Sequence, residues 1–166
     1  MPLGKDAMPQ EHQLIPQLIV RDGLAALEFY KMAFDARVVS RTMTPDGRKL
    51  VHGELLLHGR MLYVSDEFDA RQGGTCKSPD SLGGASVRIT LMVDNAGAAV
   101  ERARAAGARV LMPAQNMFWG GRYAKIVDPF GHEWGVNQPL RAQTGQETQA
   151  GADEYFGAGR HFGNDR

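Results

Sequence analysis

The chain contains an internal repeat: one strand, one helix and then three strands are predicted twice along its 166 residues. Adding 73 to the residue number carries Leu18 to Leu91. After a slip of one residue, adding 72 carries Gly59 to Gly131. One copy alone cannot bury both faces of its sheet, so the two copies are needed together. The repeat therefore predicts an α+β fold of two tandem βαβββ modules.

The first copy is outlined by apolar runs that are separated by turn residues. We predict a strand over 14–20, a helix over 22–34 that Asp22 caps, and strands over 38–42, 50–57 and 61–65. Phe29 falls off the apolar stripe of this helix, so we expect a second contact surface for it. The stripe itself consists of Leu24, Leu27, Tyr30 and Phe34.

The second copy follows the same order. We predict a strand over 87–93, a helix that Asp94 or Asn95 caps and that ends near Gly107, and strands over 109–112, 123–127 and 133–136. Residues 113–121 are expected to form a loop. The chain is thus divided into an N-terminal arm (1–13), a first module (14–66), a linker rich in Gly and Ser (67–86), a second module (87–138) and a polar tail (139–166).

The composition excludes several classes of partner. The 19 basic and 19 acidic residues give a formal net charge of zero, which argues against binding to nucleic acid or to an anionic membrane. No apolar run is long enough to cross a membrane. The single cysteine, Cys76, forms no intramolecular disulfide, so we expect a cytoplasmic protein, and we interpret Cys76 as incidental. The tail is expected to be mobile. Its aromatic residues are expected to dock on the body or on a partner subunit: Tyr155, Phe156 and Phe162.

Two stretches of the second copy, together with the repeat, resemble a known family. Residues 118–123 have the sequence FWGGRY, and residues 128–132 have the sequence DPFGH. These motifs resemble the vicinal oxygen chelate superfamily, and more narrowly the PhnB-like branch of the glyoxalase/bleomycin resistance protein/dioxygenase group. The resemblance covers about residues 14–138. It implies that each module curves a mixed sheet around a cavity and that a homodimer completes the fold. Members include metal-dependent lyases, thiol transferases and dioxygenases, and also metal-free drug-binding proteins.

The resemblance further implies four metal-ligand positions, one on the first and one on the last strand of each module. The repeat places these positions at Ile15, Tyr63, Arg88 and Gly135. Carboxylate or imidazole donors are needed there, but Ile and Gly have no donor atom and a guanidinium cation repels a metal ion. The neighbouring residues do not supply the donors either: Leu14, Pro16, Leu62, Val87 and Trp134. We therefore predict no metal and no other cofactor, with a divalent metal as the alternative.

A second group of polar residues is a candidate catalytic or metal site. His52, Glu54 and His58 are spaced by even numbers along one strand, so their side chains point to the same face. His132 and Glu133 are adjacent, so they point to opposite faces. The alternative is that these residues lie on a solvated strand face and in surface turns. We keep His52 and Glu133 as the candidates for acid–base catalysis.

The cavity is predicted to contain a polar pocket around Arg88. An inward-facing Arg88 offers a planar fork for a small anion, and the alternative is that it pairs with Glu133 across the cavity. Trp119 lies in a loop flanked by glycines that is suited to form an aromatic flap. The predicted ligand-binding residues are Arg88, Tyr63, Gln17, Thr90, Trp119 and Tyr123.

Three hypotheses follow from the sequence. The first is a metal-free member that binds a small-molecule ligand, anionic or aromatic. The second is an enzyme of the superfamily (a lyase, thiol transferase or dioxygenase) that uses an unusual metal set or acid–base chemistry. The third is a structural dimer with no small-molecule role. Because one fold hosts many chemistries, the resemblance alone does not choose among them.

Overall fold

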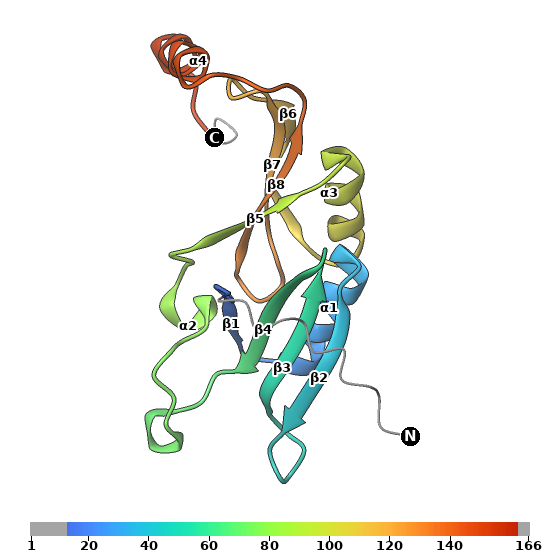
Figure 1. Cartoon of the computed structure of the whole chain (residues 1–166). Helices are drawn as coiled ribbons and strands as arrows, with labels where there is room; N and C mark the ends of the chain where they lie inside the picture. The colour runs from blue at the N-terminus through green and yellow to red at the C-terminus, as the bar shows by residue number, and fades with distance from the viewer. Residues whose placement is uncertain (1–12, 163–166) are drawn as a thin grey trace.

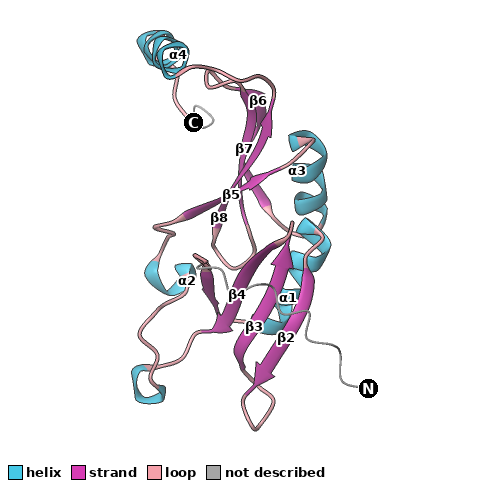
Figure 2. Ribbon diagram, viewed as in Figure 1, coloured by secondary structure: helices cyan, strands magenta, loops and turns pink. Residues whose placement is uncertain are grey.

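The computed structural model describes residues 13–162, and it consists of two modules with the same order of elements (Figures 1 and 2). The first module contains β1 (Gln17–Val20), α1 (Gly23–Phe34), β2 (Arg37–Met43), β3 (Leu50–Leu57) and β4 (Arg60–Asp66). The second contains β5 (Arg88–Met92), α3 (Ala96–Ala105), β6 (Arg109–Asn116), β7 (Gly121–Val127) and β8 (Glu133–Pro139). The predicted pair of βαβββ modules is confirmed.

Each module forms a mixed four-stranded sheet with the same topology. The strand orders are β1-β4-β3-β2 and β5-β8-β7-β6. β1 pairs with β4 in parallel, and β5 pairs with β8 in the same way. Side chains alternate between the two faces of each strand. One face packs against the helix of its own module, and α1 and α3 also contact each other where the modules join (Figure 1). The opposite face of each sheet carries most of the polar side chains.

The two modules share an aromatic core. Phe29, Tyr30 and Phe34 of α1 pack against two residues of the second module, Phe130 and Trp134. Phe29 is buried, and its ring contacts Phe130 at a centroid distance of 6.0 Å, so the predicted second contact surface is confirmed.

The predicted stripe of α1 was wrong at its first position. Leu24 is 38% exposed, because it lies on the same exposed side of α1 as Glu28 and Lys31.

A buried carboxylate joins the modules at the same place. Asp128 accepts hydrogen bonds from the Tyr30 hydroxyl at 2.7 Å and from Trp134 Nε1 at 2.9 Å. Its other oxygen accepts from the backbone N–H groups of Phe130 and His132. Burial, and then the charge of Asp128, hold the pKa of Tyr30 well above its usual range, so Tyr30 stays a proton donor. The turn before β8 is therefore fixed to α1.

The repeat extends to the contacts that start each helix. Asp66, at the end of β4, accepts a hydrogen bond from the N–H of Gly23 at 2.8 Å. Gln138, at the equivalent place on β8, accepts from the N–H of Ala96 at 3.1 Å. These N–H groups have no partner within their helices, so a side chain from the last strand satisfies them in both modules.

Several predicted boundaries were wrong. β1 begins after Pro16 rather than at Leu14, because proline cannot donate to the parallel ladder with β4. β6 continues to Asn116 although residues 113–121 were expected to be a loop. Pro113 is tolerated because β6 is an edge strand whose pairing with β7 shifts register between Met112 and Gln115. β8 also extends past Val136 to Pro139.

The linker contains two short helical turns, η1 (Ala70–Gln72) and α2 (Pro79–Leu82). Glu67 holds α2 against the first module, because its carboxylate accepts from the N–H and hydroxyl of Ser78 and from the hydroxyl of Ser81. Among residues 13–162, no helix is both long and apolar enough to span a membrane.

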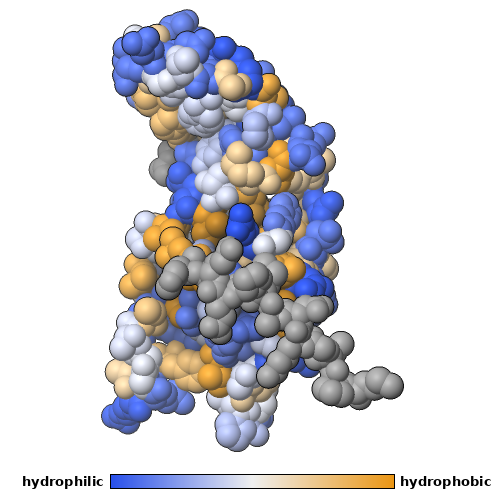
Figure 3. Space-filling model, viewed as in Figure 1, coloured by the Kyte–Doolittle hydropathy of each residue, from blue (hydrophilic) through white to orange (hydrophobic). Residues whose placement is uncertain are grey.

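The tail contains a helix, α4 (Gly145–Gly157), although its composition predicted mobility. Thr144 and Glu147 form a capping box at its start, a signal that outweighs the low apolar content. Figure 3 shows that α4, at the top of the view, exposes mostly hydrophilic surface, while apolar surface gathers nearer the junction of the modules. The predicted N-terminal arm lies, except for Gln13, outside the described residues, as do residues 163–166 of the tail.

Candidate functional site

The open face of the second sheet forms a pocket of about 360 Å³. Its floor comes from β5, β7 and β8, whose alternate residues point away from α3. The structure brings together four of the six predicted ligand-binding residues here: Arg88, Thr90, Trp119 and Tyr123. Three residues that were not predicted complete the lining: Lys125, Asn137 and Phe162.

Arg88 is engaged in an ion pair on this floor. Its Nη2 and Nε atoms donate to Glu133 Oε2 at 2.6 and 3.0 Å. The hydrogen bond to Glu133 raises the pKa of Arg88 above its ordinary value. The alternative pairing that was considered from the sequence is therefore present, and Glu133 offsets the charge of Arg88.

Lys125 is the second cation of the pocket. Its ammonium group is partly buried, and burial, followed by repulsion from Arg88, lowers the pKa of Lys125. Its Nζ donates to the backbone carbonyl of Phe162 at 3.0 Å. Lys125 was not predicted from the sequence, although strand alternation points to it, because it lies two residues after Tyr123 on β7.

Trp119 forms the aromatic wall of the pocket. Its indole N–H donates to Asn137 Oδ1 at 3.3 Å, and its ring meets Tyr123 edge-on at 5.4 Å. Arg122 donates to Asn116 across the base of the same loop at 3.2 Å. Phe118 packs against Tyr155 of α4 and is not among the lining residues of the pocket. Trp119, rather than Phe118, therefore faces the pocket.

The positions of the inherited metal site do not present a set of donors. A side chain at Gly135 would collide with the Tyr123 hydroxyl, which lies 2.5 Å from the place of a Cβ atom. Arg88 is paired with Glu133, and the Tyr63 ring lies against His52. Among the described residues, no group of three His, Cys, Asp or Glu side chains is arranged to hold a metal ion. The residues at these positions do not fit a divalent metal.

The other two predicted ligand-binding residues lie on the first sheet. Gln17 donates to Ser65 Oγ at 3.0 Å and lines a separate pocket of about 440 Å³ under the linker. Tyr63 and His52 are in edge-on contact at 4.6 Å, and His52 Nε2 lies 3.5 Å from Glu54 Oε1. The predicted pairing of Tyr63 and Gln17 with Arg88 in one pocket is therefore not formed within the chain.

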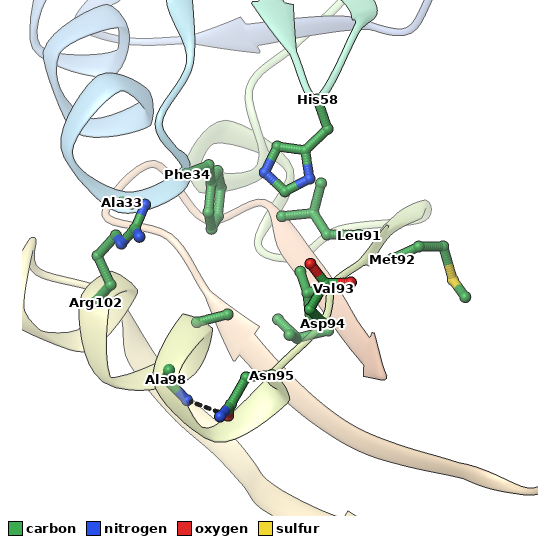
Figure 4. A pocket seen from close by; sticks show the side chains of 12 residues that line it. Ala33, Phe34, His58, Leu91, Met92, Val93, Asp94, Asn95, Ala98 and Arg102 are labelled. Atoms are coloured by element: carbon green, nitrogen blue, oxygen red, sulfur yellow. Dashed lines mark hydrogen bonds between the residues drawn. The ribbon is translucent and has the colours of Figure 1, made fainter. Parts of the chain in front are cut away.

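His58 does not join His52 and Glu54; it lies in a surface turn, as the alternative interpretation of the sequence expected. It lies in the turn after β3 with a φ of +48°, and it lines a pocket of about 280 Å³ at the module junction (Figure 4). Asp94, Arg102 and the apolar ring of Phe34 also line that pocket (Figure 4). Asn95, rather than Asp94, caps α3.

His132 has a structural contact between the two modules. Its Nε2 lies 2.9 Å from the carbonyl oxygen of Ile19, so it connects the turn before β8 to the edge strand of the first module.

Comparison with known proteins identifies a matching family and several similar chains. Residues 12–136 match the family described as the glyoxalase/bleomycin resistance protein/dioxygenase superfamily. A protein of Mycobacterium bovis described as uncharacterized is 40% identical over 144 residues, which cover 87% of this chain and 94% of that protein.

Two solved structures are similar in fold. TioX from Micromonospora sp. ML1 has a TM-score of 0.61 at 22% identity, with 78% of this chain and all of that chain covered. A glyoxalase-related enzyme from Fulvimarina pelagi has a TM-score of 0.62 at 22% identity, with 77% and 88% covered.

Proposed function

Because this chain belongs to the glyoxalase/bleomycin resistance protein/dioxygenase superfamily, we propose that it binds a small aromatic anion on the open face of its second sheet. The observation that carries the proposal is the pocket in which Lys125 and the Trp119 ring line the same space. A pocket with an aromatic wall and a few convergent polar groups is the usual form of a small-molecule site. The proposal extends the first of the hypotheses drawn from the sequence.

The charges of the floor favour an anion. Arg88 and Lys125 contribute two positive charges and Glu133 one negative charge, so the floor carries a net charge of +1. Because Glu133 already pairs with Arg88, Lys125 is the cation that gains most from a ligand's negative group. A bound anion would also offset the repulsion that Lys125 experiences from Arg88, because a nearby negative charge stabilises the protonated form of Lys125.

The polar groups around Trp119 favour a flat ring with acceptors at its edge. Asn137 already accepts from the Trp119 indole, and Thr90 and Tyr123 add hydroxyl groups to the lining. Aromatic faces pack against flat rings in offset or edge-on geometry. A ligand that joins a ring to an acidic group matches both parts of the pocket, and no step of its binding requires a metal.

A direct test is titration of metal-chelator-treated protein with 2-naphthoate, a planar aromatic anion, by calorimetry. Lys125→Met should weaken binding by about tenfold or more, since hydrogen bonds to charged groups contribute roughly 1.5–3 kcal/mol. The matched control is Lys31→Met, because Lys31 pairs with Glu28 on the exposed side of α1. Equal weakening in both variants, or binding that requires an added divalent ion, would refute the proposal.

A second candidate function rests on the first sheet. His52, Glu54 and Tyr63 form a polar cluster on its open face, and an imidazole beside a carboxylate is suited to general acid–base catalysis. Under this candidate, the protein turns over a substrate and His52→Gln abolishes turnover while leaving 2-naphthoate binding unchanged. The predicted homodimer and the assignment to the PhnB-like branch remain predictions. Sedimentation equilibrium tests the dimer, which should appear at twice the mass of 18.2 kDa.

A further inference from the structure

The C-terminal segment of the chain folds back over the candidate pocket. After β8, the N–H groups of Leu140 and Arg141 both donate to the carbonyl of Gly120, at 2.9 and 3.0 Å. The segment then forms α4 and returns, so that Phe162 becomes part of the lining of the pocket. Figure 1 places α4 at the top of the view, near the end of β6.

Phe162 uses the two groups that the proposed function assigns to the ligand. Its ring lies 5.9 Å from the ring of Trp119. Its carbonyl oxygen accepts the hydrogen bond from Lys125 at 3.0 Å, and the Lys125 ammonium also lies 5.8 Å from the Phe162 ring. The Phe162 ring thus contacts the Trp119 ring, and the Phe162 carbonyl oxygen accepts from Lys125, the cation that is not paired with Glu133.

We propose that Phe162 is an internal substitute for the ligand and that the ligand is an arylalkanoate, which displaces it. In phenylalanine, two carbon atoms link the ring to the carbonyl carbon. An aromatic ring joined by two carbon atoms to a carboxylate therefore matches both contacts. This inference rests on the proposed function. It narrows the ligand class from aromatic anions to arylalkanoates, and it adds a competition between the ligand and the segment that carries Phe162.

The segment that contains α4 and Phe162 is attached to the body by few contacts, so it can detach from the pocket. No residue of α4 is buried, and the capping box of Thr144 and Glu147 stabilises the helix without help from the body. α4 contacts the body at Phe118, through Tyr155, Phe156 and Gly151. The Phe162 ring also packs on Tyr155 and Phe156 of its own segment and on Phe118 of the body. Segments with few buried apolar contacts open at low cost compared with the core. The helix can therefore move as one unit about residues 140–143.

The ligand has an electrostatic advantage over the segment. A carboxylate makes a charge-assisted hydrogen bond with an ammonium group, which is stronger than the bond from the same donor to a neutral carbonyl. The segment has the advantage of being attached to the chain. Because docked Phe162 occupies the Trp119 ring and the Lys125 ammonium group, the apparent affinity for the ligand is reduced in proportion to the fraction of molecules in which Phe162 is undocked. Removal of the Phe162 ring should raise that fraction.

The test compares the binding of 3-phenylpropionate to full-length variants by calorimetry. Phe162→Ala should bind at least about fivefold more tightly than the natural chain, since the open fraction rises. The control is His161→Ala, because the hydrogen bond from the Tyr155 hydroxyl goes to the backbone carbonyl of His161, which the substitution keeps, so affinity should not change. Addition of Lys125→Met to Phe162→Ala should remove the gain. Benzoate and 3-phenylpropanol should bind more weakly than 3-phenylpropionate.

Hydrogen exchange gives an independent readout of the displacement. Amides of α4 should exchange faster in the natural chain when 3-phenylpropionate is bound. Unchanged or weaker binding by Phe162→Ala would overturn the inference, because Phe162 would then be a fixed wall of the pocket. That result leaves the proposed function intact if 2-naphthoate still binds through Lys125. The proposed function itself fails if neither compound binds any of these chains in a Lys125-dependent way.

Discussion

The Tyr30 hydroxyl donates a 2.7 Å hydrogen bond to Asp128 Oδ2 across the junction of the two modules. Both side chains are buried, and the bond fixes the turn that precedes β8. Because β8 carries Glu133 and Asn137, this contact between modules also fixes part of the candidate pocket.

Tyr30→Phe should therefore destabilise the whole chain. The variant removes one of four hydrogen bonds to a buried carboxylate, which should lower the free energy of unfolding by about 1–3 kcal/mol in urea denaturation. Tyr155→Phe is the matched control, since Tyr155 donates only to an exposed carbonyl, and it should change the free energy by less than about 0.5 kcal/mol. Equal effects of the two variants would show that the junction is not held by this bond.

Glu67 should make the stability of the chain depend on acid pH. Hydrogen bonds from the N–H and hydroxyl of Ser78, and then from Ser81, lower the pKa of Glu67 from 4.5 to about 2. Because the folded pKa lies below the unfolded pKa, the stabilisation is present above pH 4.5 and is lost as the pH falls from 4.5 toward 2. Glu67→Gln should remove this part of the pH dependence in urea denaturation. A constant difference between the two proteins across that range would contradict the assignment.

Gly135→Ala should disturb the floor of the pocket. The added Cβ atom would lie 2.5 Å from the Tyr123 hydroxyl and 2.8 Å from Thr90 Oγ1, so Tyr123 must move. Overpacking of this kind costs about 1–3 kcal/mol. We expect weaker binding of 2-naphthoate, measured by calorimetry. Gly84→Ala is the control, because a Cβ atom at Gly84 meets no other atom within 4 Å. Full affinity in Gly135→Ala would place the ligand elsewhere.

The sequence predicts the repeated architecture well because its signals are local and occur twice. Asp22 and Asn95 cap equivalent helices, and the turn glycines Gly59 and Gly131 recur at nearly the same offset. Pro113 misled the boundary of β6, because a proline on an edge strand removes a donor that the sheet does not need. Whether a strand lies at an edge depends on the fold, which local sequence does not contain.

The candidate site was only partly predictable. Arg88 and Tyr63 were placed by the repeat from the ligand positions that the family resemblance implies, and Thr90 and Gln17 followed from strand alternation. Grouping all four assumed that both sheets face one cavity. Within the chain the two open faces carry separate pockets. The contribution of Phe162 depends on how α4 returns to the body, and sequence spacing gives no measure of that path.

Chemical-shift mapping of the chelator-treated, isotope-labelled protein with 2-naphthoate shows directly whether the pocket on the second sheet binds an aromatic anion. We expect the largest shifts at the backbone amides of Thr90, Lys125 and Asn137, with saturation and without any added metal. Shifts confined to Glu54, Tyr63 and Ser65 on the first sheet, or to the junction around His58, would contradict this expectation.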